Sequence, residues 1–328
     1  MIKYSIIVPC FNSENFIKVC LDVLTKQTID KGLFEVIFVD DCSKDNTVQI
    51  LERYKKQVDF KVQILQNKVN SGPGVSRHNA AMAAVGEYLC FCDSDDWYSE
   101  DFLLDINTEL EESCSDMLVF DMSYVLGEKI IRKNYTAPFC YGDKFSYLSN
   151  CAESLCNLVV KRSLFLSIPL LDVRNGEDLA LVPLLIAKSD KISHIDKSYY
   201  NYVMRSDSAS LGKIAPRAFN NMLLAFRHIC QNLDSSNIDI QKCIEYLGIK
   251  TVLYNATLMA IKGGNNNNVL AQIVDDFSVS YPEWSKNSYK NRLGLAKNVY
   301  LWAVKSRLWL ICRLFATLHS YLLKHSYD

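Results

Sequence analysis

The N-terminal part of the chain alternates between apolar, β-rich runs and amphipathic runs, and a polar loop follows each apolar run. Strands that alternate with helices predict an α/β fold with a Rossmann-like, mostly parallel sheet and helices on both faces. Because the carboxyl ends of parallel strands meet at one edge of a sheet, the polar loops are expected to lie together there. The predicted strands are residues 4–8, 34–39, 62–66 and 88–92, and the predicted helices are 16–27, 47–56 and 75–85.

The most acidic loop is Asp93-Ser94-Asp95-Asp96, directly after the fourth predicted strand. Carboxylates this close repel one another unless a cation binds between them. Mg²⁺ typically keeps one or two protein carboxylates and takes other ligands from substrate phosphates. The stretch therefore indicates a metal-diphosphate site. The alternative is a solvated acidic turn that caps the next helix, since Asp and Ser are good N-cap residues.

Polar side chains also follow the other three predicted strands. Pro9 and Asn12 come after the first strand, Asp40 and Asp41 after the second, and Gly72-Pro73-Gly74 after the third, just before Arg77. The loops after the second and third strands also have structural explanations. Asp40 and Asp41 could cap a helix, Gly72-Pro73-Gly74 could form a tight turn, and Arg77 could lie on an exposed helix face. The expected convergence on one edge favours a binding site.

These motifs together resemble the family 2 glycosyltransferases of the GT-A fold. The resemblance is carried by residues 7–12, 39–45, 72–80 and 93–97. It is close over about residues 1–110 and looser to about 210. It implies a nucleotide-sugar donor, usually a UDP-sugar, a divalent metal such as Mn²⁺ or Mg²⁺, and transfer with inversion at the anomeric carbon.

The resemblance also implies roles for single residues. Asp41 would accept a hydrogen bond from the uracil, and the backbone near Pro9 would flank the base. Asp93 would approach the ribose or metal-bound water, and Asp95 would bind the metal that bridges the diphosphate. Both aspartates are thus candidate metal ligands. The remaining residues of the implied donor site are Asn12, Arg77, Ser94 and Arg205.

An inverting transfer also needs a base for the acceptor hydroxyl, on the opposite side of the donor sugar ring. The resemblance assigns this role to the pair Glu177-Asp178, usually to the aspartate. Asp178 is therefore the predicted base and Glu177 the alternate. The structural alternative is a helix start, where acidic residues are favourable.

The aromatic segment at residues 199–202 leads into Arg205-Ser206 and a hydroxyl-rich stretch to Ser210. It resembles the strand and loop that close the catalytic domain in relatives making bacterial surface polysaccharides. A lid over the donor diphosphate, with Arg205 as its cationic contact, is expected. The alternative is an edge strand with a polar loop.

A GT-A domain is predicted over residues 1–212 and a helical region over 213–328, with helices at 217–233, 238–261 and 269–277. The segment 293–324 reads as one basic amphipathic helix without an acid. A peripheral contact with a membrane would suit it. The alternative is packing on its own domain or in a homo-oligomer.

Composition narrows the choice of function and location. A formal net charge of -1 over 328 residues argues against a nucleic-acid partner. The twelve cysteines are scattered without a CxxC pair, and the N-terminus runs straight into a strand without a signal-peptide core. We therefore expect a cytoplasmic protein, at the inner face of the membrane if the helix contact holds.

The sequence thus predicts an inverting, metal-dependent hexosyl- or N-acetylhexosaminyltransferase that acts on a saccharide or lipid-linked saccharide acceptor in surface polysaccharide synthesis. One alternative is a nucleotidyltransferase, although the loop after the first strand lacks the glycines expected of it. A second is a catalytically silent scaffold of the same fold that binds a partner through its C-terminal helices.

Overall fold

The computed structural model describes residues 1–127, 129–133, 144–150, 153–173, 176–205, 215–233 and 237–325. The chain divides into two compact units. The first is Met1–Lys144 with Cys151–Met204, and the second is Phe145–Asn150 with Arg205–Asp328. The boundary predicted after residue 212 lies outside the described residues.

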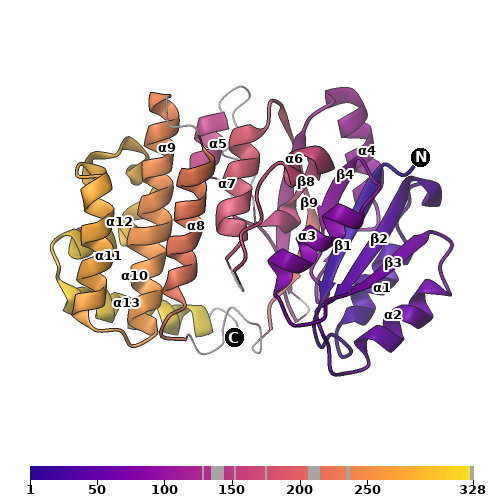
Figure 1. Ribbon diagram of the computed structural model, residues 1–328, viewed down its shortest axis with the longest axis horizontal. Coiled ribbons are helices and arrows are strands. Elements are labelled where there is room, and N and C mark those ends of the chain that lie inside the picture. Colours follow the sequence, from indigo (N-terminus) through magenta and orange to yellow (C-terminus); the bar gives the residue numbers. More distant parts are fainter. Residues whose placement is uncertain are drawn as a thin grey trace. The chain divides into compact units, whose positions relative to one another are not determined.

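The first unit contains a nine-stranded sheet with the order β3-β2-β1-β4-β8-β6-β9-β5, with β7 paired to β6 (Figure 1). Parallel pairing joins β1 to β2 and β4, β2 to β3, and β6 to β9, which confirms the predicted α/β fold and its mostly parallel sheet. The strands are β1 (Tyr4–Cys10), β2 (Phe34–Asp40), β3 (Lys61–Gln66), β4 (Tyr88–Phe91), β5 (Trp97–Tyr98), β6 (Met117–Leu126), β7 (Lys129–Lys133), β8 (Leu158–Lys161) and β9 (Ile192–Val203).

Helices cover both faces of the central strands. Every residue of β2 is buried, as expected for a parallel strand between two helical layers. On one face Ile6 shares a core with Leu21 of α1 and Leu51 of α2, and on the other Phe91 stacks against Phe165 of α6, with 5.1 Å between ring centroids. The helices of this unit are α1 (Ile17–Thr25), η1 (Lys31–Leu33), α2 (Thr47–Lys55), α3 (Pro73–Ala83), α4 (Phe102–Ser113), η2 (Leu155–Asn157), α6 (Arg162–Leu166) and α7 (Asp178–Lys188).

The segment predicted as a strand or a short helix around residues 157–162 forms both. The 3₁₀ turn η2 leads into β8, and α6 follows. β8 lies antiparallel between β4 and β6, a position that the local pattern could not predict because it depends on two partner strands. This placement of β8 brings η2 beside the acidic loop that follows β4.

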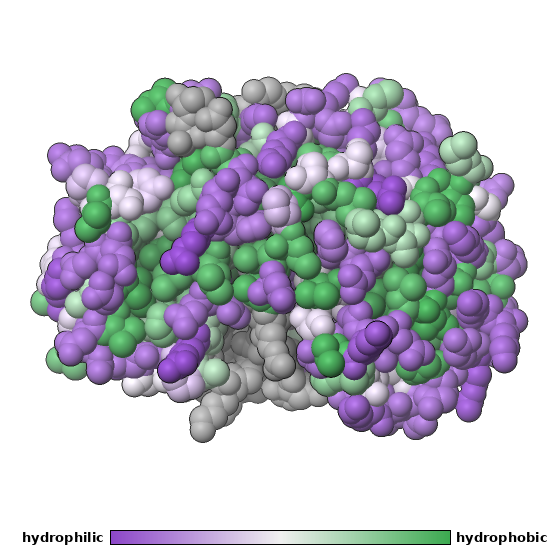
Figure 2. Space-filling model, in the orientation of Figure 1, coloured by the Kyte–Doolittle hydropathy of each residue, from purple (hydrophilic) through white to green (hydrophobic). Residues whose placement is uncertain are grey.

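The second unit consists of helices that lie side by side (Figure 1). Its apolar side chains reach the surface among polar ones (Figure 2), as Ile238 and Val279 do. The predicted helix 238–261 is α9 continued by a π-helical stretch, η3, and by α10. The helices are α5 (Lys144–Asn150), whose first residue belongs to the first unit, α8 (Phe219–Asn232), α9 (Ile238–Gly248), η3 (Ile249–Ala256), α10 (Thr257–Lys262), α11 (Asn267–Ser280), η4 (Trp284–Lys286), η5 (Ser288–Leu293), α12 (Gly294–Lys305) and α13 (Trp309–His325).

The prediction of one continuous helix over residues 293–324 is wrong. The helix ends at Lys305 and restarts at Trp309, because Arg307 adopts a left-handed conformation with φ of 56°. α13 packs within its own unit through Phe315, whose ring contacts those of Tyr254 and Tyr300. No helix in the described part of the chain combines the length and apolarity needed to span a bilayer.

Candidate active site

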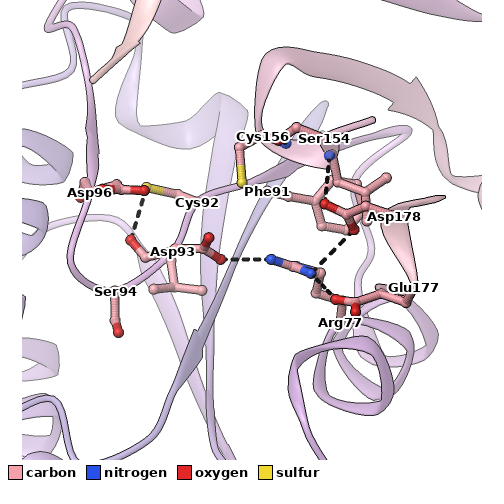
Figure 3. A network of polar contacts seen from close by, with 12 residues as sticks. Arg77, Phe91, Cys92, Asp93, Ser94, Asp96, Ser154, Cys156, Glu177 and Asp178 are labelled. Atoms are coloured by element: carbon pink, nitrogen blue, oxygen red, sulfur yellow. Dashed lines mark hydrogen bonds and ion pairs between the residues drawn. The ribbon is translucent and has the colours of Figure 1, made fainter. Parts of the chain in front are cut away.

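Four charged side chains from three separate elements meet at the carboxyl edge of the sheet (Figure 3). Arg77 of α3 stands between Asp93, which follows β4, and the pair Glu177 and Asp178 at the start of α7. Its Nη2 donates to Asp93 Oδ1 at 2.7 Å, and its Nη1 donates to Glu177 Oε1 at 2.5 Å. The same nitrogen lies 3.5 Å from Asp178 Oδ1. The predicted base is therefore tied through one guanidinium to the acidic loop.

The start of α3 makes room for this contact. Gly72 has a φ of 89°, a conformation that favours glycine, and Pro73 begins the helix. A Cβ on Gly74 would lie 3.1 Å from Cγ of Glu177. The Gly-Pro-Gly turn thus sets the path of the helix and leaves space for Glu177 against Arg77.

The cluster contains one guanidinium and three carboxyl groups, and the side chains of Arg77 and Glu177 are buried. Burial alone would lower the pKa of Arg77, but the carboxylates of Asp93, Asp178 and Glu177 raise it well above its usual value. Burial raises the pKa of Asp178 to about 7, against the opposing effect of Arg77 and with the support of Glu177. Such a pKa suits a general base at neutral pH.

Asp178 is also held by the backbone of η2. Its Oδ2 accepts a hydrogen bond from the Leu155 N–H at 3.2 Å. Its side chain retains 21% exposure, whereas that of Glu177 retains 5%. Asp178 is therefore the more accessible of the two, as the prediction of Asp178 over Glu177 requires, while Glu177 serves Arg77.

The three acids of the loop after β4 differ in their surroundings. Asp96 is buried, and its carboxyl lies 2.6 Å from the Tyr200 hydroxyl and accepts the Val203 N–H at 2.7 Å. Burial, with Asp93 and Asp95 nearby, raises its pKa well above the usual value. Asp96 therefore links the loop to β9. No local pattern predicts this role, because Tyr200 and Val203 are 104 and 107 residues away in the sequence.

Asp93 and Asp95 are the two acids that a metal could reach. The Asp93 side chain is 36% exposed, and Asp95 is half-buried. Among the described residues, no group of three or more His, Cys, Asp or Glu side chains is placed to hold a metal. Two carboxylates with diphosphate and water oxygens are nevertheless the usual set for Mg²⁺, so these residues fit a metal-diphosphate complex.

Asp41 is buried at the end of β2, and its carboxylate binds the loop before α3. It accepts hydrogen bonds from Asn67 Nδ2 at 2.8 Å, from the Ser71 N–H at 2.9 and 3.1 Å, and from the Gly72 N–H at 2.7 Å. Its predicted contact with uracil would have to displace one of these donors. The neighbouring Asp40 has a buried Oδ1 that finds no hydrogen-bond partner among the residues the structure describes.

The other predicted donor-site residues connect neighbouring loops. Asn12 has a φ of 48°, and its N–H donates to Ser43 Oγ at 2.9 Å. Ser94 is buried, with its hydroxyl 2.9 Å from that of Ser13. Pro9 is half-buried within β1. The loops after β1, β2 and β4 thus form one bonded surface, and the nucleotide contacts stay predictions.

Arg205 belongs to the second compact unit, and residues 206–210 of the expected lid lie outside the described residues. The role of Arg205 stays a prediction. The aromatic run before it forms the end of β9.

Residues 5–165 match a family model described as Glycosyl transferase family 2. The poly(ribitol-phosphate) β-N-acetylglucosaminyltransferase TarS of Staphylococcus aureus is 41% identical over 140 residues, 42% of this chain and 24% of that protein. A poly(ribitol-phosphate) β-glucosyltransferase of Bacillus spizizenii is 29% identical over 253 residues, 75% of this chain and 39% of that protein. The chain thus spans well under half the length of either relative.

Solved structures share the fold. A crystal structure of S. aureus TarS 1–349 in complex with UDP-GlcNAc has a TM-score of 0.69 at 23% identity, with 98% of this chain and 92% of that chain covered. The mannosyltransferase PcManGT of Pyrobaculum calidifontis, in complex with GDP-Man and Mn²⁺, has a TM-score of 0.58 at 15% identity, with 94% and 87% covered. The predicted GT-A fold is confirmed.

Proposed function

We propose that this chain, which belongs to glycosyl transferase family 2 through residues 5–165, transfers a sugar from a UDP-sugar to a saccharide or lipid-linked saccharide with inversion. The observation that carries the proposal is the junction of Asp93, Arg77 and Asp178 at one edge of the sheet. In this proposal Asp93 is the acid on the diphosphate side and Asp178, with a pKa of about 7, is the base, and Arg77 contacts both.

The reaction follows from this arrangement. The acceptor oxygen forms a bond to the anomeric carbon, and the bond from that carbon to the β-phosphate oxygen breaks with its electron pair leaving on UDP. The acceptor proton passes to the Asp178 carboxylate. Attack opposite the leaving group inverts the configuration. Arg77 keeps Asp178 oriented, and Glu177 balances the buried charge of Arg77.

Asp93 and Asp95 would hold Mn²⁺ or Mg²⁺ together with the diphosphate. A divalent cation there stabilises the negative charge that develops on the leaving UDP. Asp96 is excluded as a ligand in this proposal because its carboxyl is committed to Tyr200 and Val203. Asp41 or Asp40, with Pro9 and the other predicted donor-site residues, would contact the nucleoside.

We propose the donor sugar and the acceptor as chemical classes. The relatives' names give N-acetylglucosaminyl and glucosyl transfer to poly(ribitol-phosphate) for those proteins. We extend to this chain the broader statement, hexosyl or N-acetylhexosaminyl transfer in surface polysaccharide synthesis. A polyol-phosphate acceptor is included in the acceptors to be tested.

We also propose a peripheral membrane contact through α12 and α13. Leu314 and Leu318 of α13 are 62% and 56% exposed one turn apart, and Trp302 of α12 is 57% exposed. Residues 284–327 contain eight Lys or Arg and no Asp or Glu. Exposed apolar side chains on a segment rich in Lys and Arg suit anionic lipid headgroups at the inner face of a membrane, although Arg307 and Lys286 are paired with Asp275 and Glu283.

The function is tested by a thermal-shift screen of the whole chain against UDP, GDP, CDP and TDP, each with and without Mn²⁺, followed by hydrolysis assays with UDP-glucose and UDP-GlcNAc. A metal-dependent shift with UDP and release of UDP from one donor are expected. Without any nucleotide shift or hydrolysis, the silent scaffold becomes the better account.

A further inference from the structure

A pocket of about 350 Å³ adjoins the cluster, and Asp93 forms part of its lining. This volume lies in the range of small-ligand pockets, roughly 300–1,000 Å³. The lining of the pocket includes Asp93, Met122, Tyr124, Glu153, Ser154 and Tyr202.

The lining suits an uncharged, polyhydroxylated ring. The rings of Tyr124 and Tyr202 pack edge to face, with centroids 5.4 Å apart, and Tyr200 adds a third tyrosine. Aromatic faces can pack on the C–H face of a sugar, and the carboxylates of Asp93 and Glu153 can accept hydrogen bonds from its hydroxyl groups.

A phosphate group does not suit the same lining. Among the described residues that line the pocket there are two carboxylates and no Lys, Arg or His. Lys133 lies 5.7 Å from the Tyr124 ring centroid but does not line the pocket. The described lining offers a phosphate group no direct cationic partner, and Asp93 would reach a diphosphate only through a bound metal. The lining itself therefore favours a neutral saccharide.

The order of the strands separates this pocket from the proposed nucleotide side. Pro9 and Asp41 follow the path of β1 and β2, whereas Tyr124 and Tyr202 belong to β6 and β9. β4, which leads into Asp93, lies between the two groups in the sheet. If the donor nucleotide contacts the loops after β1 and β2, Asp93 would lie between the nucleotide and the pocket.

The pocket also borders the proposed base. Ser154 and Cys156 line it, and the residue between them, Leu155, donates its N–H to Asp178 Oδ2 at 3.2 Å. A ring bound in the pocket would therefore lie next to the backbone that holds Asp178, where an acceptor needs to bind.

We infer that this pocket is the acceptor subsite and that it binds a neutral saccharide unit against Tyr124 and Tyr202. The inference rests on the proposed function, and it adds the acceptor's chemistry and the residues that select it. The attacking hydroxyl transfers its proton to Asp178 as its oxygen bonds to the anomeric carbon and UDP departs with the electron pair.

The test compares the whole chain with Tyr124→Ala, Tyr202→Ala and Tyr124→Phe. Three quantities are measured: UDP affinity with Mn²⁺, hydrolysis of the UDP-sugar by water, and saturation-transfer NMR contact with methyl β-D-glucoside and methyl β-D-N-acetylglucosaminide in the presence of UDP. The alanine variants should keep UDP affinity and hydrolysis within about twofold and lose roughly tenfold in glycoside affinity. Tyr124→Phe, which retains the ring, should behave as the parent.

Three outcomes would overturn the inference. The first is an absence of NMR contact with either glycoside in a parent that hydrolyses the UDP-sugar. The second is equal glycoside contact in parent and alanine variants. The third is a parallel loss of donor hydrolysis in the alanine variants, which would make the pocket a donor-sugar site. A parent that neither binds UDP nor hydrolyses a donor would instead contradict the proposed function.

Discussion

Arg77 and Glu177, one hundred residues apart in the sequence, form a buried ion pair with 2.5 Å between Nη1 and Oε1. Each side chain is 5% exposed. The pair joins α3 to the start of α7, and Nη2 of the same guanidinium donates to Asp93. The position of the proposed base therefore depends on a contact that is formed only in the folded chain.

Glu177→Ala should destabilise the protein, because it removes the closest partner of a buried cation. We expect the free energy of unfolding to fall by about 3 kcal/mol, the lower end for breaking a buried ion pair, since Asp93 and Asp178 still contact Arg77. Glu177→Gln retains an acceptor oxygen and should lose less. Urea denaturation of both variants measures the difference. Equal stability of Glu177→Ala and parent would show that the pair contributes nothing.

Asp178→Asn should leave UDP affinity nearly unchanged and reduce the transfer rate by about 10²–10⁴-fold, as expected for a lost general base. Because only the deprotonated carboxylate accepts a proton, the parent rate should fall as pH is lowered through the pKa of about 7 and level off above it. Single-turnover transfer across this pH range tests both points. A flat pH profile, or a variant as fast as the parent, would assign the base to another residue.

Asp95→Ala should abolish metal-dependent UDP binding if this carboxylate holds the cation. Asp96→Asn is the matched control one residue away. The asparagine amide can accept the Val203 N–H through its oxygen and donate to the Tyr200 hydroxyl through its nitrogen, so metal-dependent UDP binding and stability should persist. Asp96→Ala leaves those partners unsatisfied and should cost about 1–3 kcal/mol of stability. Calorimetry with UDP and Mn²⁺ would contradict the assignment if Asp95→Ala bound as the parent does.

Leu314→Glu should weaken binding to anionic vesicles, because it places a negative charge in the exposed stripe of α13. Leu224→Glu, at an exposed apolar position on α8, is the control and should bind as the parent does. Co-sedimentation with phosphatidylglycerol-containing vesicles at two salt concentrations measures the effect, and higher salt should weaken the parent. Parental binding by Leu314→Glu, or none by the parent, would leave this face to a protein partner.

Local sequence was sufficient for the α/β fold and for most of the proposed site. Continuous apolar runs predicted the first four strands, because a parallel sheet is buried on both faces, and period-3.6 patterns predicted the helices between them. Chain order alone then predicted that the loop at Asp93 and the helix at Arg77 share an edge. Asp178 was predicted as the base from the family resemblance, and its catalytic role stays a prediction.

Only the tertiary structure decided what depends on distant partners. Asp96 has the same sequence neighbourhood as Asp95, but its pairing with Tyr200 and Val203 buries it and makes it a structural residue. The placement of β8 between β4 and β6 fixes the preceding turn η2, which brings the Leu155 N–H to Asp178 and contributes Cys156 to the lining of the pocket beside Asp93. These features arise from contacts between segments far apart in the chain, whose energies no local pattern encodes.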